Sequence, residues 1–128
     1  MATIEKTCQH LYGNTQTIVV DVPSGTDYQA GGLGCFGNLV GISVVDAKGG
    51  APVTFAGNGV WRCKYKTGES FSVGDEVYVD GTTRELIALP ETAGTYVCAG
   101  TAIGVDETAE TIDLVLNFIG ITKTVEGE

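Results

Sequence analysis

The sequence predicts one small all-β domain, a β-barrel or a β-sandwich of about eight short strands. Runs rich in β-branched residues recur at intervals of roughly 8–12 residues, which is typical of such folds. Glycine-rich turns separate these runs: the chain of 128 residues has 19 glycines, whereas average usage predicts roughly nine. An apolar period of about 3.6 residues, which marks an amphipathic helix, does not persist over three turns.

The predicted strands follow one another along the chain, and most end at a glycine, a proline or an acidic turn. They lie in residues 15–22, 38–45, 52–56, 59–66, 72–80, 84–89, 96–105 and 111–118. Residues 26–34, with three glycines near their end, are predicted to form a loop. The strands at 52–56 and 59–66 are predicted to pair as a hairpin across Gly57 and Asn58.

Alternating side chains predict which faces of two strands are buried. In residues 59–66 the face expected in the core holds Trp61, Cys63 and Tyr65. The other face of this strand holds Val60 and three of the seven basic residues, Arg62, Lys64 and Lys66. In residues 111–118 one face is apolar throughout, with Ile112, Leu114, Leu116 and Phe118. This alternation predicts a half-buried strand near the end of the domain.

The two ends of the chain differ from the predicted domain. Residues 1–14 show no sustained period and end at Gly13 and Asn14, which predicts an extended N-terminal arm. Residues 120–128 have little apolar content and are predicted to form a flexible C-terminal tail. The β domain is therefore expected to span residues 15–119.

The charge balance excludes several classes of partner. The chain carries 16 acidic and 7 basic residues, a net charge of −9. Proteins that bind nucleic acid concentrate lysine and arginine, because contacts to phosphate supply most of the affinity. We therefore expect neither nucleic acid nor a membrane surface as a partner. No apolar stretch is long enough to span a bilayer, and the first residues lack the pattern of a signal peptide.

The cysteines and the single histidine, His10, do not form a recognisable metal site. Cys8, Cys35, Cys63 and Cys98 are far apart and lack a C-x-x-C spacing. We expect reduced thiols, because disulfides are rare in proteins made in the cytosol. We expect no metal and no cofactor, because the spacing of these residues matches no known ligand pattern. Two disulfides formed after release from a cell are the alternative that the sequence leaves open.

Two pairs of adjacent carboxylates stand at predicted turns, Asp75–Glu76 and Asp106–Glu107. Facing carboxylates can hydrolyse glycosides and acidic oxygen atoms can bind Ca²⁺, but turns also favour polar residues. His10 has no recognisable nucleophile motif around it. We predict that the protein is not an enzyme, with a small hydrolase that uses Asp75 or Asp106 as the alternative.

Between residues 17 and 117, the order and spacing of several segments resemble a family of small head proteins of tailed bacteriophages. The segments are residues 37–42, 46–47, 53–55, 59–61, 71–80, 99–105 and 111–117. Members of this family are capsid decoration (cement) or capsid fibre proteins, often catalogued only as a domain of unknown function. The chain departs from the family pattern in its arm, the loop at 26–34, its four cysteines and its tail.

The resemblance implies a decoration protein on the outer capsid surface of the virion, made in the host cytoplasm. Such a protein binds the major capsid protein and stabilises contacts between its subunits. A homo-oligomer is implied as well, with a trimer favoured. The arm is expected to reach over the capsid, and its truncation to abolish binding while the core stays folded. As capsid-binding residues we expect Ile4, Lys6, His10, Leu11 and Tyr12.

For self-association we expect Phe55, Trp61, Arg62 and Lys64. Aromatic residues and arginine are enriched at the centres of interfaces, although the two aromatic residues could instead belong to the core. The rival function is another virion-associated β module, such as a receptor- or carbohydrate-binding spike domain. A spike domain of this kind exposes aromatic residues in its loops, and Tyr28 is the candidate for that role.

Overall fold

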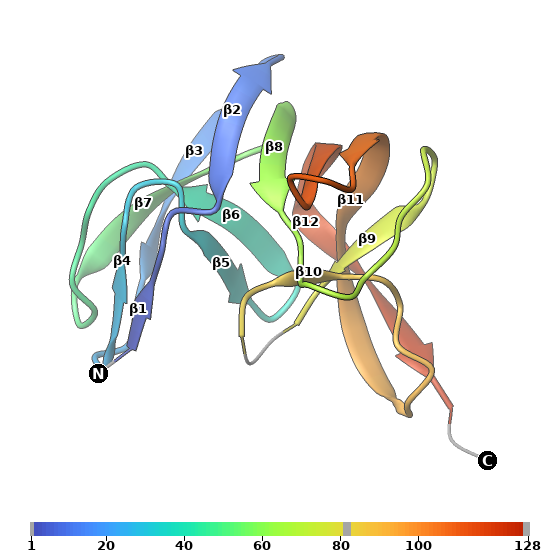
Figure 1. Ribbon diagram of the computed structural model, residues 1–128. Coiled ribbons are helices and arrows are strands. Elements are labelled where there is room, and N and C mark those ends of the chain that lie inside the picture. Colours follow the sequence, from blue (N-terminus) through green and yellow to red (C-terminus); the bar gives the residue numbers. More distant parts are fainter. Residues whose placement is uncertain (1, 81–82, 127–128) are drawn as a thin grey trace.

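The computed structural model describes residues 2–80 and 83–126, which form an all-β protein, as predicted (Figure 1). The strands are β1 (Ala2–Ile4), β2 (Cys8–Tyr12), β3 (Gln16–Asp21), β4 (Thr26–Tyr28), β5 (Leu33–Phe36), β6 (Leu39–Ser43), β7 (Pro52–Gly57), β8 (Val60–Lys64), β9 (Glu76–Val79), β10 (Leu86–Ile87), β11 (Gly94–Asp106) and β12 (Thr111–Val125). The loop predicted at residues 26–34 contains β4 and the start of β5.

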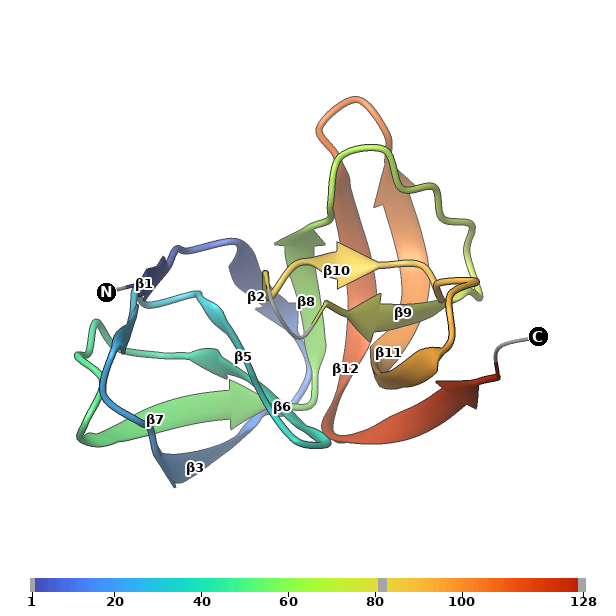
Figure 2. The same ribbon diagram turned by 90° about the horizontal axis from the view of Figure 1, so that it is seen from below.

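The strands pair in two groups that lie side by side (Figures 1 and 2). One group contains β3, β5, β6 and β7, and the other contains β2 together with β8 to β12. β1 and β4 form a small parallel pair beside the first group. A single residue pair, Leu39 with Ile119, connects β6 to β12 and joins the two groups. The described strands therefore form open, packed sheets and no closed barrel.

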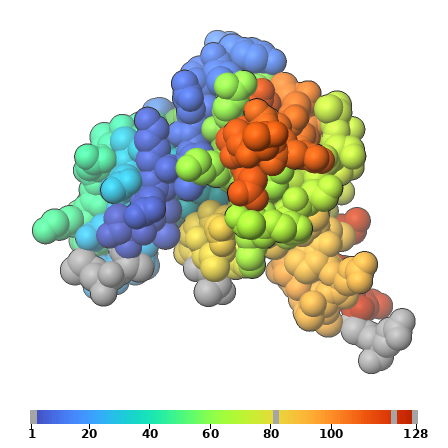
Figure 3. All heavy atoms as spheres, in the orientation of Figure 1, coloured from blue at the N-terminus to red at the C-terminus, as the bar shows by residue number. Residues whose placement is uncertain are grey.

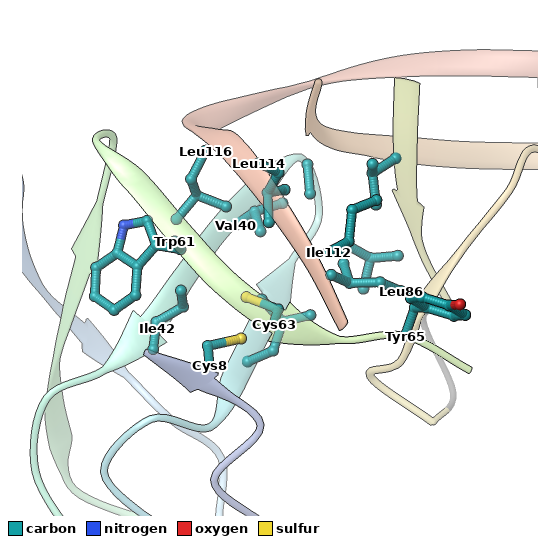
Figure 4. Close-up of a cluster of buried hydrophobic side chains, with 14 of the residues drawn as sticks. Cys8, Val40, Ile42, Trp61, Cys63, Tyr65, Leu86, Ile112, Leu114 and Leu116 are labelled. Carbon is teal, nitrogen blue, oxygen red and sulfur yellow. The ribbon is translucent and has the colours of Figure 1, made fainter. Parts of the chain in front are cut away.

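The main core contains side chains from both groups of strands (Figure 4). The two apolar faces predicted from alternation are confirmed, because all of their side chains are buried: Trp61, Cys63, Tyr65, Ile112, Leu114, Leu116 and Phe118. The basic side chains on the other face of β8 and just after it are exposed. Residues from β6, such as Val40 and Ile42, pack into the same core and complete its other side.

The predicted hairpin between β7 and β8 is wrong. β7 pairs with β3 and β6, whereas β8 pairs with β2 and β12. The chain crosses between the groups at Asn58 and Gly59, whose φ angles are 63° and 78°. Both angles lie in the left-handed region, which glycine and asparagine adopt most readily. The same residue types also form hairpin turns, which is why the sequence suggested one here.

Asn58 fixes this crossover through three hydrogen bonds. Its Oδ1 accepts a hydrogen bond from the backbone N–H of Phe118 (3.1 Å), and its Nδ2 donates one to Oε1 of Gln16 (3.1 Å). Its carbonyl oxygen accepts a hydrogen bond from Nε1 of Trp61 (2.7 Å). Beside it, the ring of Phe118 packs so closely on Gly57 that a Cβ atom there would collide with it. The crossover therefore connects β3, β8 and β12.

Residues 2–12 are largely extended, as expected of an arm, but they pair within the fold. β1 pairs with β4, and β2 pairs with β8. Cys8 on β2 is 3% exposed and belongs to the main core. In the space-filling view this segment lies along the surface of the molecule (Figure 3). A single buried residue in a polar run gives no periodic signal, so the sequence did not predict this packing.

β12 continues to Val125, whereas residues 120–128 were expected to form a flexible tail. The end of β12 pairs with residues 94–98 of β11, and the resulting ribbon projects from the rest of the molecule (Figure 1). Its register shifts at a bulge next to Gly100, which lies against the backbone of Val115. Most of the expected tail is therefore a paired strand, and the last two residues lie outside the described part of the chain.

Asn58→Ala is expected to lower the free energy of unfolding by about 2–3 kcal/mol. It removes two side-chain hydrogen bonds and places alanine in the left-handed region. Asn58→Gly is the matched control, because it loses the same hydrogen bonds but tolerates the backbone angle, and we expect about half the loss. Urea denaturation followed by the fluorescence of Trp61 measures both. A wild-type midpoint for Asn58→Ala would contradict this role of the crossover.

Deletion of residues 2–12 is expected to destabilise the core by about 3 kcal/mol or more, because it uncovers Cys63 and Trp61 on β8. The sequence predicted that truncation leaves the core folded, whereas the pairing of β2 with β8 predicts the loss of stability. The measurement is the urea midpoint of the deletion variant against the wild type. Gln9→Ala, on the exposed side of β2, serves as the control and should change the midpoint little. An unchanged midpoint after deletion would show that β2 contributes nothing to the core.

Candidate docking surfaces

An uncharged groove lies where the two groups of strands meet, beside the crossover. Its volume is about 580 Å³, and it is lined by Gln16, Ile18, Leu39, Asn58, Asn117, Phe118 and Ile119. None of these residues is charged, although the chain carries 16 acidic and 7 basic residues. Figure 2 shows β12 passing beside β6 in this part of the molecule. An uncharged concave surface of this kind fits an apolar segment of a partner.

The groove exposes one large apolar side chain in particular, that of Ile119, which is 63% exposed. Phe118, its neighbour on β12, is buried against Gly57. Ile119 keeps the alternation of buried and exposed positions along β12 but, like Val115, places an apolar side chain where alternation predicts a polar one. That departure was visible in the sequence, but the groove was not, because its lining comes from four separate segments of the chain.

Of the five residues expected to bind the capsid, two are partly buried in the fold and three are exposed. Ile4 lies on β1 and packs against the small core around Phe55, and Leu11 is half-buried. Lys6, His10 and Tyr12 are exposed. The His10 ring lies 5.0 Å from that of Trp61 between centroids, and its Nε2 is 3.0 Å from the carbonyl oxygen of Gly13. His10 is therefore exposed to solvent on one side and packs against the buried ring of Trp61 on the other.

Two of the four residues expected to mediate self-association lie in the core, which corrects that expectation. Phe55 is 1% exposed, and its ring meets that of Tyr28 edge-on, with centroids 5.2 Å apart. Trp61 is 5% exposed and lies behind β2. Neither ring can touch a second copy without a rearrangement of the fold. Arg62 and Lys64, the other two, are exposed on the outer face of β8.

The outer face of β8 is less basic than its sequence indicates. Arg62 forms a two-pronged ion pair with Asp113 on β12, with Nε–Oδ1 and Nη2–Oδ2 distances of 2.8 and 3.1 Å. The hydrogen bond to Asp113 and the charge of that carboxylate raise the pKa of Arg62. Next to this pair, an apolar row crosses three strands, with Val60 on β8 between Tyr12 on β2 and Val115 on β12. Val60 is buried, at 8% exposed, although alternation placed it on the same face as the basic residues, whereas Tyr12 and Val115 are exposed. This face therefore combines a neutralised ion pair with two exposed apolar side chains.

The residues considered for other functions have structural roles. Tyr28, the aromatic residue proposed for glycan binding, is 3% exposed on β4, and burial raises the pKa of its phenol. Oδ2 of Asp75 accepts a hydrogen bond from the backbone N–H of Ser72 (2.8 Å). Oδ1 of Asp106 accepts two such bonds within its own turn, at 3.0 Å each. These carboxylates thus stabilise turns.

Within residues 2–80 and 83–126, no three side chains of His, Cys, Asp or Glu come together as ligands of a metal ion. The same part of the chain contains no helix with the length and apolar character needed to cross a membrane.

Comparison with protein families identifies the chain. A family model described as phage cement protein matches residues 13–118. The chain belongs to the phage cement protein family. Its role is therefore that of a capsid cement, or decoration, protein, as the resemblance indicated. The match begins between β2 and β3 and ends within β12, so the first two strands lie outside it. Neither the curated proteins nor the solved structures gave a match.

Proposed function

We propose that this cement protein binds the outer surface of the phage head and docks on the major capsid protein through the uncharged groove. The observation that carries the proposal is the groove itself. Membership of the cement protein family points to the capsid as the partner. The groove offers that partner an uncharged surface, although the chain as a whole has a net charge of −9. An apolar segment of the capsid subunit, placed against Ile18 and Ile119, is the occupant we assign to it.

The acidity of the chain supports the outer face of the shell over the inner one. Packaged DNA carries one negative charge for every 1.7 Å or so of duplex. An acidic protein on the inner face would be repelled by that DNA, whereas the outer face imposes no such cost. Binding that spans neighbouring capsid subunits would then stabilise the shell by mass action, because the cement protein binds the assembled lattice and not the separate subunits.

We assign the protein no catalytic role. The family is one of structural cement proteins, and the carboxylates of Asp75 and Asp106 are engaged by the backbone of their own turns. The spike-domain alternative loses its aromatic candidate, because Tyr28 is buried.

Ile119→Asp is expected to weaken binding to heads that lack the protein by roughly tenfold or more, since it places an unpaired charge in the docked groove. The measurement is a saturation curve from co-sedimentation with purified heads. Val73→Asp is the matched control, because Val73 is 69% exposed, against 63% for Ile119, and lies before β9, away from the groove. Equal binding by Ile119→Asp and the wild type would overturn the assignment of the groove.

We also propose that the protein assembles as a homotrimer through the outer face of β2, β8 and β12. The apolar row from Tyr12 to Val115 supports this, since Tyr12 is 60% and Val115 is 42% exposed. The neighbouring Arg62–Asp113 pair lowers the repulsion between copies on this face.

Sedimentation equilibrium of the wild-type protein should give three times the mass of one chain. The variant Val115→Asp should give the mass of a single chain. The reason is that the substitution adds a charge at the exposed β12 end of the apolar row. Val19→Asp on β3, where Val19 is 66% exposed, is the control and should leave the mass unchanged. A single-chain mass for the wild type would contradict self-association, and a trimer that persists in Val115→Asp would contradict this face.

A further inference from the structure

Cys8 and Cys63 face each other across β2 and β8, inside the main core. They are direct partners in the antiparallel register, and both are buried, at 3% and 1% exposed. In the close-up their side chains lie next to each other, between Ile42 and Ile112 (Figure 4). The other two cysteines have no such neighbour: their thiols donate to backbone carbonyl groups two residues ahead, at 3.6 and 3.4 Å. The four cysteines therefore include one matched pair.

The hydrogen bonds around this pair define its geometry. The backbone N–H of Lys64 donates to the carbonyl oxygen of Thr7 (2.9 Å), and the N–H of Cys8 donates to Gly31 and not to Cys63. Cys8 and Cys63 are therefore a non-hydrogen-bonded antiparallel pair, in which the Cα atoms lie about 4.5 Å apart and the side chains are closest. Disulfides form at Cα separations of roughly 4.4–6.8 Å, so this pair can close without movement of the strands.

We propose that Cys8 and Cys63 form a disulfide when the protein meets an oxidising medium, and that this bond fastens β2 to β8. The oxidant we name is a small-molecule disulfide, such as oxidised glutathione. One cysteine thiolate attacks a sulfur of the reagent and releases one thiol; the second thiolate then attacks the mixed disulfide and releases the other. Two cysteine thiols are oxidised, the two sulfurs of the reagent are reduced, and both protons end on the released thiols.

The environment of the pair sets when the reaction occurs. Burial, together with a hydrogen bond to the Cys8 thiol, raises the pKa of Cys63 well above its ordinary value. Little Cys63 thiolate forms while β2 is in place, and both side chains are buried, so the pair is poorly accessible to an oxidant in the closed state. β2 pairs with no strand other than β8 among the described residues. Transient opening of this edge strand exposes both thiols at once, and its return brings them back into register.

The bond has a structural consequence for the segment outside the family match. β2 lies before residue 13, where the match begins, and it pairs with the edge of β8. A link between residues 8 and 63 would convert this edge strand into a permanent part of the domain. The capsid of a released phage lies outside the reducing cytosol, where disulfides persist. The reduced and oxidised protein would therefore differ in how readily β2 leaves the fold.

The test uses the variant Cys35→Ser/Cys98→Ser. In the wild type, trypsin leaves Cys8 and Cys35 on the same peptide, residues 7–48, so a link from that peptide to Cys63 would not show which cysteine had reacted. This variant is incubated with oxidised glutathione, the remaining thiols are alkylated in acidified denaturant, and the tryptic digest is analysed by mass spectrometry. We expect a single product two hydrogens lighter, with Cys8 joined to Cys63. Thermal unfolding should shift upward by about 10 °C and return on reduction.

Cys8→Ser/Cys63→Ser is the control, and its thermal midpoint should not respond to the oxidant. Should it fail to fold, Cys8→Ala alone serves, since it keeps β2 apolar at that position and leaves Cys63 without a partner. The proposal is overturned if Cys8 and Cys63 of Cys35→Ser/Cys98→Ser are both still alkylated after incubation with a concentration of oxidised glutathione that modifies Cys35 in the wild-type protein. It is also overturned if the product contains two glutathione adducts instead of the Cys8–Cys63 link, or if the link joins separate chains.

Discussion

The structure depends on the passage of the chain from β7 to β8 at Asn58. A hairpin at this point would have made the two strands hydrogen-bonded neighbours. The left-handed backbone of Asn58 and Gly59 instead directs β8 away from β7, and β8 then pairs with β2 and β12. Because the Asn58 side chain binds both Gln16 and the backbone of Phe118, the N-terminal and C-terminal strands are connected at the same residue.

The groove follows from this passage. Asn58 lines it, and the residues that Asn58 contacts, Gln16 and Phe118, line it as well. The surface that we assign to the capsid therefore includes the hydrogen-bonded crossover. A surface that is already ordered loses less conformational entropy on binding than a mobile one, which suits the docking that we propose.

The sequence predicted the fold class and the family, because these depend on local patterns and on the order of segments. The alternation along residues 111–118 correctly identified the buried face of β12. Pairing between distant strands was harder to predict: Gly57 and Asn58 signal a turn, but turn chemistry does not say which strands become neighbours. The burial of Cys8 was missed for a related reason, since its partner, Cys63, lies in a strand 55 positions along the sequence.

The expected site residues show the same limit. Trp61 and Phe55 were considered as interface anchors or core residues, and only the packing decides that they are core. The groove could not have been predicted, because its residues come together only after β7 and β8 separate into different groups. The roles of Arg62 and Lys64 in self-association stay predictions, as does the docking of the capsid in the groove.

Cryo-electron microscopy of phage heads decorated with the purified protein would show which surface of the protein docks on the capsid. We expect density for the protein on the outer face of the shell, with Ile18 and Ile119 turned toward a capsid subunit and an apolar capsid segment in the groove. Density in which the groove faces solvent, while another surface contacts the shell, would contradict this expectation.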